Sequence, residues 1–365
     1  MRKLYRLVVL STLLGLCSCG ENEPPLPPPP PPPSEETAAL YILCEGLWGN
    51  NNSTLAYYSF DNQVSDNDYF NTINGRGLGD TGNDMKIYGS KIYIAVTTSS
   101  QIEVIDAHTG LSLRQLPVFD EGKPREPRHL AFDKGKVYAT CFDGTIIRID
   151  TLSLEIDNTA KAGRDPEGIC VANGKLYVAN SGGKSFPNYD NTISVIDIAS
   201  FKEVKKIEVA INPYIVEADG YGDVYVSSQG NYNDKKYKLQ RINSQTDKVE
   251  DTFDTETLNF CISGDYAYLY NYDYSNKTNW VKVLNVKTEE IERENFITDG
   301  TEIYTPRGIA VNAATSEVFI SDAFDFMIRG TVFCFNENGT LKYKIEKVGI
   351  TPNQIVFVNK EQESN

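Results

Sequence analysis

The chain of 365 residues has few of the residue types that enzymes use most often for catalysis and metal binding. It contains two histidines, three methionines and two tryptophans, and its seven cysteines form no CxxC pair or other metal-ligand spacing. No HExxH motif, no Ser-His-Asp pattern and no glycine-rich phosphate loop is recognisable. Nothing in these patterns argues for an enzyme, and the sequence predicts no catalytic cofactor and no metal site.

Basic charge is also scarce. The sequence has 50 acidic and 35 basic residues, a formal net charge of −15 at pH 7. Nucleic acids demand a net basic surface, so the composition disfavours them as partners. It suits a globular head that must not adhere to an anionic cell envelope.

Residues 1–18 have the pattern of a lipoprotein signal peptide. Three basic residues precede the apolar run Leu7–Leu16, which is shorter than the roughly 20 residues of a membrane-spanning helix. In the LCSC stretch that follows, Cys19 is the expected lipidation site, because lipidation at Cys17 would need cleavage after the bulky Leu16. An ordinary secretory signal with incidental cysteines is the alternative.

Residues 19–37 form the expected tether between the lipidated cysteine and the folded domain. Two prolines at 24 and 25 and the run Pro27–Pro33 predict a polyproline II segment, extended at about 3 Å per residue. We therefore expect a lipid anchor, a stiff stalk, one domain over residues 38–360 and a short tail at 361–365.

The domain is built from repeats, of which the stretch Asp165–Val209 is the clearest. Asn173-Gly174 is a strong signal for a two-residue hairpin turn, because both turn positions need positive φ. The stretch contains four short runs that mix β-branched, aromatic and small residues and predict an antiparallel meander: Glu167–Ala172, Lys175–Asn180, Asn191–Asp197 and Glu203–Val209.

Two independent registers count seven copies of this unit. The second strands align on an aromatic residue: Tyr41, Tyr93, Tyr138, Tyr177, Tyr225, Tyr268 and Phe319. The third strands end at an Asx residue, whose side chain can bond nearby backbone amides in the following turn: Asp61, Asp106, Asp150, Asp197, Asn243, Asn285 and Asn336.

One copy is divided between the two ends of the chain. Thr351–Asn359 supplies a first strand, whereas Ala39–Cys44, Ser53–Phe60 and roughly Val64–Asn71 supply strands two to four. Joining them closes a ring and removes exposed sheet edges, which an open solenoid would not explain. The sequence predicts an all-β fold, a seven-bladed β-propeller with four-stranded antiparallel blades, closed by the C-terminal strand.

Long loops are expected on one face of this ring. The second-to-third loops and the crossings between blades share a face, which we call the loop face; the other turns share the turn face. Aromatic and amide side chains concentrate on the loop face, as expected for a large, partly flat, uncharged ligand. We expect about half of these aromatics to be structural. The candidate ligand-binding residues are Trp48, Asn51, Arg128, His129, Phe186, Tyr189, Gln229, Tyr232, Tyr272, Tyr274, Arg307, Phe324 and Phe326.

Five cysteines fall within predicted strands of five different blades. Such scattered residues are expected to be buried thiols that act as small hydrophobic side chains, not a disulfide framework. They are Cys44, Cys141, Cys170, Cys261 and Cys334.

Several segments resemble a known family. PEGICVANGKLYVANSG, followed by NTISVIDIASFKEVKKIEV, resembles the YVTN-type, YncE-like propeller repeat. YILCEGLWGNNNSTLAYYSFD, SDAFDFMIRGTVFCFNENG and GITPNQIVF resemble Bacteroidetes surface lipoprotein propellers, a group that includes the BtuG cobalamin-binding proteins. The similarity covers about residues 40–358. One departure is Cys44 in LCEG, where the family pattern has asparagine.

This resemblance implies a non-catalytic lipoprotein that captures cobalamin or another corrinoid and passes it to a TonB-dependent outer-membrane transporter of the BtuB type. The acidic segment Gly20–Glu23 resembles the export signal that sends such lipoproteins to the outer face of the outer membrane, so the resemblance implies a surface-exposed head.

Three other functions remain open. A carbohydrate-binding or adhesion module would also use aromatic and amide side chains, and a protein-interaction platform would use the same face. An enzyme would require a cluster around His129 or close carboxylates. The carboxylates on the loop face are Glu167, Asp190, Asp273, Asp322 and Asp325, and loop acids in solvent are the better expectation for them.

Overall fold

The computed structural model describes residues 36–360. The predicted signal peptide, the lipidation site Cys19, nearly all of the tether and the C-terminal tail lie outside the described residues. Within residues 36–360, no helix is long and apolar enough to cross a membrane.

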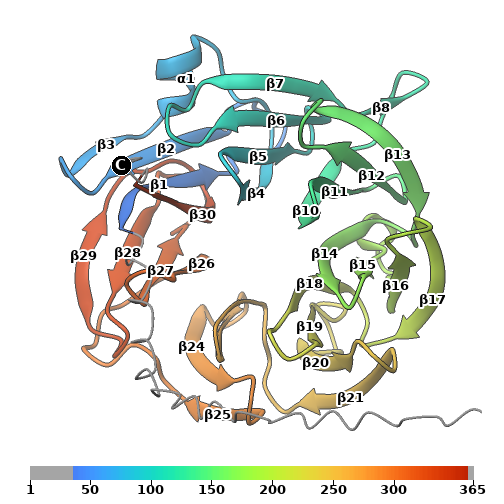
Figure 1. Cartoon of the computed structure of the whole chain (residues 1–365). Coiled ribbons are helices and arrows are strands. Elements are labelled where there is room, and N and C mark those ends of the chain that lie inside the picture. The colour runs from blue at the N-terminus through green and yellow to red at the C-terminus, as the bar shows by residue number, and fades with distance from the viewer. Residues whose placement is uncertain (1–35, 361–365) are drawn as a thin grey trace, which may run out of the picture. The chain divides into compact units, whose positions relative to one another are not determined.

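Seven four-stranded antiparallel sheets form a closed ring, which confirms the predicted seven-bladed propeller (Figure 1). The strands of blade 1 are β4 (Gly82–Tyr88), β5 (Lys91–Val96), β6 (Gln101–Asp106) and β7 (Ser112–Pro117); those of blade 2 are β10 (Pro127–Asp133), β11 (Lys136–Cys141), β12 (Thr145–Asp150) and β13 (Glu155–Lys161). Blade 3 has β14 (Pro166–Ala172), β15 (Lys175–Asn180), β16 (Thr192–Asp197) and β17 (Lys202–Glu208), and blade 4 has β18 (Pro213–Ala218), β19 (Asp223–Ser228), β20 (Lys238–Asn243) and β21 (Lys248–Phe253). Blade 5 has β22 (Asn259–Ser263), β23 (Tyr266–Asp273), β24 (Thr278–Asn285) and β25 (Glu290–Arg293), and blade 6 has β26 (Pro306–Asn312), β27 (Glu317–Asp322), β28 (Thr331–Phe335) and β29 (Leu341–Ile345).

Blade 7 joins the two ends of the described chain, as predicted. Its innermost strand is β30 (Pro352–Asn359), followed outward by β1 (Thr37–Cys44), β2 (Thr54–Ser59) and β3 (Val64–Asp66). β1 and β30 pair antiparallel, with Tyr41 opposite Val356. This pairing leaves no open sheet edge at the junction.

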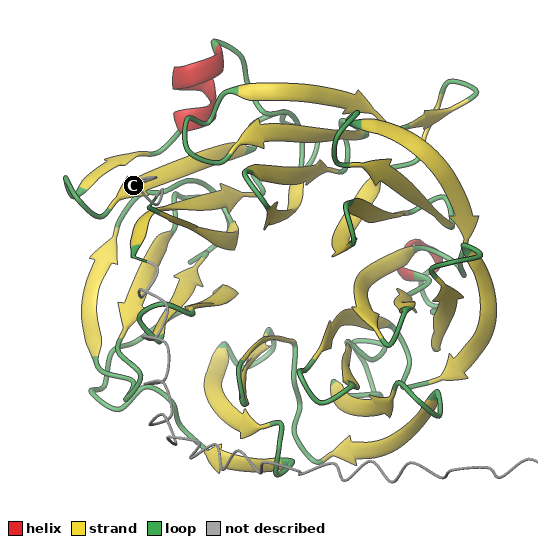
Figure 2. Cartoon of the chain, viewed as in Figure 1, coloured by secondary structure: helices red, strands yellow, loops and turns green. Residues whose placement is uncertain are grey.

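The predicted fourth strand of this blade is wrong in its second half. β3 ends at Asp66, and Tyr69–Asn74 forms the short helix α1, the red coil at the rim in Figure 2. Phe70 of this helix is fully buried in the cluster that contains Tyr41. Phe70 thereby packs α1 against the core that blades 7 and 1 share. A second unpredicted element is the small hairpin of β8 (Phe119–Asp120) and β9 (Lys123–Pro124).

Both sequence registers have a structural role. Every aromatic residue of the second-strand register is buried. At the third-strand ends, the Asx side chain accepts backbone N–H bonds from the following turn at Asp106, Asp150, Asp197, Asn243, Asn285 and Asn336. Asp61 instead forms an ion pair with Lys360 at 3.0 Å.

The cysteines are single thiols. Four of the five that were placed in strands are buried and Cys261 is half-buried, and all five are free. Burial raises the pKa of the Cys44 thiol to about 12, so this thiol stays protonated and behaves as an apolar side chain.

Proline shapes the inner strands. Six of the seven shift register against the second strand within their first residues, which marks a β-bulge at β4, β10, β14, β18, β26 and β30. Five of these strands begin with proline, which has no N–H for the ladder, and β4 begins with Gly82. β22 begins at Asn259 and pairs regularly. Arg128 and Arg307 lie within two of these bulges, directly after Pro127 and Pro306.

Candidate binding face and central channel

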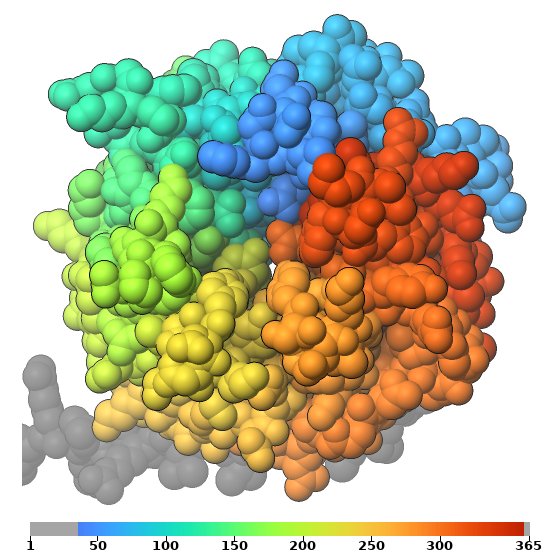
Figure 3. All heavy atoms as spheres, turned by 180° about the vertical axis from the view of Figure 1, so that it is seen from behind, coloured from blue at the N-terminus to red at the C-terminus, as the bar shows by residue number. Residues whose placement is uncertain are grey.

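Exposed aromatic side chains gather on the loop face. Trp48 is 82% exposed and Phe186 is 72% exposed, although both are large apolar residues. Tyr232, Tyr274 and Tyr304 are also exposed. Figure 3 looks onto this face, where loops coloured blue, lime, yellow and orange surround a central hollow. The predicted concentration of aromatics is therefore present, and much of their ring area contacts solvent.

Three of the predicted aromatics form one continuous row across blades 3 and 4. The Phe186 and Tyr189 rings meet edge-on at 6.0 Å, and Tyr189 meets Tyr232 in the same way at 6.0 Å. The Tyr232 hydroxyl donates a hydrogen bond to Gln229 Oε1. These contacts hold the rings in place, so a flat ligand would meet a pre-formed surface.

Blades 4 and 5 enclose a cavity of about 160 Å³ beside this row. Gln229, Tyr232 and Tyr274 line it, which brings three predicted site residues together. Tyr272 does not line this cavity: it lies on β23, is 7% exposed and belongs to the core, with its ring edge-on to Tyr274 at 4.7 Å. The predicted loop 270–280 is shorter in the structure, because β23 and β24 extend into both of its ends.

The remaining predicted loop residues support their own loops. The Asn51 backbone N–H donates to Asp80 Oδ2 at 3.2 Å, which anchors the loop that carries Trp48. Phe324 and Phe326 are half-buried with positive φ, and the Phe324 carbonyl accepts a bond from the Thr305 hydroxyl. Both residues belong to the loop face, but neither side chain is as exposed as Trp48 or Phe186.

Two ion pairs lie where the inner strands begin. Arg128 donates from Nε and Nη2 to the two carboxylate oxygens of Glu167, at 2.8 and 3.2 Å. Its guanidinium also lies 4.4 Å from the centre of the Phe142 ring. In the second pair, Arg307 donates to Glu45 Oε2 at 2.8 Å. Both arginines that the sequence assigned to ligand binding therefore already have a carboxylate partner.

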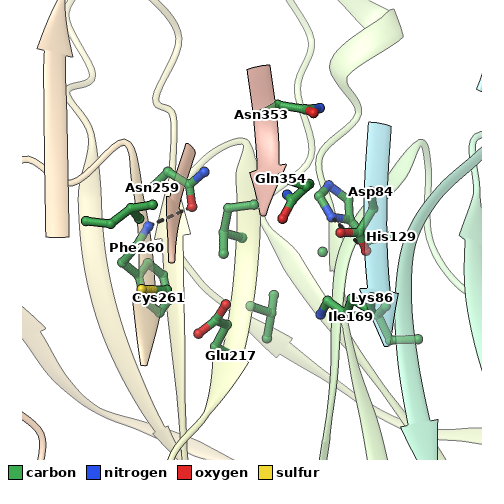
Figure 4. A pocket seen from close by; sticks show the side chains of 14 residues that line it. Asp84, Lys86, His129, Ile169, Glu217, Asn259, Phe260, Cys261, Asn353 and Gln354 are labelled. Carbon is green, nitrogen blue, oxygen red and sulfur yellow. Dashed lines mark hydrogen bonds and ion pairs between the residues drawn. The ribbon is translucent and has the colours of Figure 1, made fainter. Parts of the chain in front are cut away.

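His129 lies between two carboxylates. Its Nδ1 is 3.8 Å from Asp84 Oδ2 and its Nε2 is 3.6 Å from Glu167 Oε2. The ring is buried and Nε2 has no hydrogen-bond partner. Figure 4 shows His129 and Asp84 together in the wall of the channel cavity. That cavity measures about 50 Å³, room for a few water molecules but far too small for a corrin ring.

The pKa values of the two channel acids Glu217 and Glu167 shift in opposite directions, because their charged neighbours differ. Burial raises the pKa of Glu217 to about 7, against the effects of nearby Lys86 and of the Ile262 N–H bond. Burial would also raise the pKa of Glu167, but Arg128 and His129 outweigh it and hold that pKa below its usual value. At neutral pH, Glu167 is ionised and Glu217 is about half protonated.

Most acidic side chains on the loop face already accept hydrogen bonds from nearby groups of the protein. Asp273 accepts bonds from the Ser275 and Asn276 N–H groups, and Asp325 from those of Met327 and Ile328. Asp190 accepts bonds from the Asn191 N–H and the Thr192 hydroxyl. Asp322 accepts bonds from the Tyr304 and Thr305 N–H groups of the crossing before β26. Within residues 36–360, no group of three or more His, Cys, Asp or Glu side chains is arranged to hold a metal ion.

Sequence reasoning missed several residues that shape this region. Glu45, Asp84, Lys86 and Glu217 were not assigned roles, and Asn271 in the blade 4–5 cavity was overlooked. An initial proline marks the inner strand of only one of these channel residues, Glu217 on β18, since Asp84 and Lys86 lie on β4, which begins with glycine. No comparable signal marks Asn271.

Comparison with solved structures supports the fold alone. The propeller is similar to a quinonprotein alcohol dehydrogenase-like protein from Bacteroides thetaiotaomicron, at 16% identity and a TM-score of 0.61 over 88% of this chain and 78% of that one. It is also similar to Kuenenia stuttgartiensis hydrazine synthase, at 16% identity and a TM-score of 0.57 over 74% of this chain and 93% of that one. The computationally designed Ika8 protein matches at 14% identity and a TM-score of 0.54, over 87% and 90% of the two chains.

No curated protein sequence matches the chain. A family profile described as a domain of unknown function, DUF5074, matches residues 38–348, which is nearly the whole propeller. The chain belongs to the DUF5074 family.

Proposed function

We propose that the protein is a non-catalytic, surface-exposed lipoprotein of the outer membrane, anchored through Cys19, that captures a large ligand on its loop face. Cobalamin or a related corrinoid is the favoured ligand, for delivery to a TonB-dependent transporter of the BtuB type. The single observation that carries the proposal is the set of exposed aromatic rings on one face, above a channel cavity of about 50 Å³ that is far too small for a corrinoid.

Exposed rings on a folded surface suit a partly flat, apolar ligand. Each ring contact contributes about 0.5–1.5 kcal/mol beyond area burial, so four or five together would support tight binding. The row of Phe186, Tyr189 and Tyr232 is held by edge-to-face contacts, which lowers the entropy cost of ordering it around a ligand. Amide groups such as Gln229 would bond the polar groups at the ligand's edge.

The contacts of the charged residues also favour binding over catalysis. Arg128 and Arg307 are paired with Glu167 and Glu45, and the channel cavity beside His129 holds about 50 Å³. His129 lines this cavity but is only 6% exposed, so little of its ring is open to a substrate. We therefore assign the cluster to the support of the loop face.

Calorimetric titration of the purified protein with cyanocobalamin and cobinamide tests this function. We expect saturable binding at one site for both ligands, and heat from neither would refute corrinoid capture. A glycan array on the same preparation separates the carbohydrate-binding alternative, and co-purification with an outer-membrane barrel in the absence of small ligand separates the protein-interaction alternative.

A further inference from the structure

The cavity between blades 4 and 5 is a distinct chamber beside the aromatic row. It measures about 160 Å³, well above the roughly 10–15 Å³ of cavity space that a single water molecule needs. The rings of Tyr232, Tyr237 and Tyr274 form part of its wall. A corrin ring is far too large for this space, whereas a short side arm of a few heavy atoms fits.

One polar group in the wall has no partner. Asn271 lies near the end of β23, lines the cavity and is only 6% exposed. Its side-chain carbonyl oxygen, Oδ1, is buried and accepts no hydrogen bond. A buried acceptor without a donor is costly, so an unpaired one beside a cavity indicates a place for a donor group.

Two more unpaired polar atoms lie in the segments that form this wall. Ser228 Oγ and Thr257 Oγ1 are fully buried and have no hydrogen-bond partner. Each is next in sequence to a residue that lines the cavity, Gln229 and Glu256 respectively. Neither residue lines the cavity itself, so Asn271 is the residue of its wall that offers an unpaired acceptor.

The charges around the cavity balance. Lys235 and Lys236 line it together with Glu256 and Asp273. The Asp273 carboxylate is already bonded to the backbone and side chain of its own turn. Two positive and two negative groups favour an uncharged occupant that can both donate and accept hydrogen bonds.

We propose that this cavity receives a primary-amide side arm of the ligand captured on the loop face, with the arm's N–H donating to Asn271 Oδ1. A corrinoid carries several such arms around its ring, so one arm can enter the cavity while the ring lies against Tyr232 and its neighbours. This inference rests on the proposed function and adds how the ligand's orientation is fixed.

The test uses cyanocobalamin and its monocarboxylic acid derivatives, in each of which one side-arm amide is hydrolysed to a carboxylate. We expect one positional isomer to bind the wild-type protein at least about tenfold more weakly than cyanocobalamin, because a carboxylate offers Asn271 Oδ1 no donor and places a negative charge against that carbonyl oxygen. The other isomers should bind within about twofold of the parent.

Variants at position 271 test whether Asn271 causes this difference in affinity between the amide and the acid. Asn271→Leu should weaken cyanocobalamin binding and reduce the difference between amide and acid to about twofold, whereas Asn271→Asp should enlarge it by charge repulsion. Asn158→Ala, at an exposed position of the outer strand β13, is the matched control and should bind as wild type. The comparison of isomers on wild-type protein needs no variant, so it is decisive even if Asn271→Leu does not fold.

The outcomes separate this inference from the function on which it rests. If cyanocobalamin binds but all isomers bind within twofold, or if discrimination persists in Asn271→Leu, the amide-arm site is wrong and corrinoid capture stands. If no corrinoid binds at all, the proposed function fails and this inference fails with it.

Discussion

The Glu167 carboxylate of blade 3 accepts both of its Arg128 hydrogen bonds, at 2.8 and 3.2 Å, across the boundary with blade 2. The two side chains are 9% and 11% exposed, so the pair is largely removed from water. Their geometry follows from the bulges after Pro127 and Pro166. The pair therefore couples two blades at the start of their inner strands, close to where the ligand is proposed to bind.

Arg128→Met should destabilise the protein by about 3–5 kcal/mol, because it leaves the Glu167 charge buried without its partner. Urea unfolding at pH 7 measures the change. The double variant Arg128→Met/Glu167→Leu should recover much of the loss, since it buries no unpaired charge. If Arg128→Met unfolds at the same urea concentration as the wild type, the Arg128–Glu167 pair does not stabilise the fold.

Glu217 should make stability fall with rising pH. Its folded pKa of about 7 lies above the ordinary glutamate value of 4.5, so the folded state binds the proton more tightly than the unfolded state. This contribution is fully present below pH 4.5 and is lost as the pH rises through about 7. Glu217→Gln should flatten that slope and stabilise the protein at pH 8 by on the order of 1–3 kcal/mol. Unfolding curves measured from pH 4 to 8 test this, and an unchanged slope in the variant would contradict it.

Among the aromatic residues of the second strands, Tyr177 should contribute strongly to the stability of the folded protein. This ring is fully buried in the core of blades 3 and 4, and its hydroxyl donates to Asp247. Tyr177→Ala should cost about 3–5 kcal/mol, whereas Tyr177→Phe keeps the ring and should cost only about 1 kcal/mol. Thermal unfolding of the two variants measures the difference, and equal losses would mean that the hydrogen bond, not the ring, stabilises the blade.

The repeat pattern predicted the fold because propeller blades obey local rules. A buried aromatic such as Tyr93 and an Asx turn such as that at Asp106 are each visible in one short stretch of sequence, and seven copies leave little ambiguity. α1 escaped prediction because Phe70 is buried in a cluster of residues, such as Tyr41 and Met85, that are distant from it in the sequence.

The candidate site was harder to predict, because it depends on contacts between residues that are distant in the sequence. The sequence correctly placed Trp48, Phe186 and Tyr232 on an exposed face, because loop position follows from strand order. It could not tell that β23 extends far enough to bury Tyr272, or that Asn271 would be left without a partner. Those facts depend on strand lengths and side-chain contacts between blades.

Removal of the last strand should open the ring. A chain that ends at Gly349 loses β30 and exposes the inner edge of β1, together with apolar residues such as Leu40 and Ile42. Free strand edges of this kind favour association between chains. We expect aggregated protein by size-exclusion chromatography, whereas a monodisperse, folded product would show that closure is dispensable.

Aromatic residues of the loop face should control affinity without affecting stability. Trp48→Ala and Tyr232→Ala each remove an exposed ring and should weaken corrinoid binding about threefold to tenfold. Leu152→Ala is the matched control, because Leu152 is 90% exposed in the turn between β12 and β13 on the turn face. Calorimetry with unchanged melting temperatures tests this, and equal affinity in all three variants would exclude these rings from the site.

Hydrogen–deuterium exchange with and without cyanocobalamin tests the central claim most directly, because it reports where the ligand lies. We expect slower exchange on ligand addition in the loop-face segments 46–52, 181–191, 228–236 and 270–280, and no change in the turns at 106–110 and 197–200. Protection confined to the turn face, or no protection at saturating ligand, would contradict capture on the loop face.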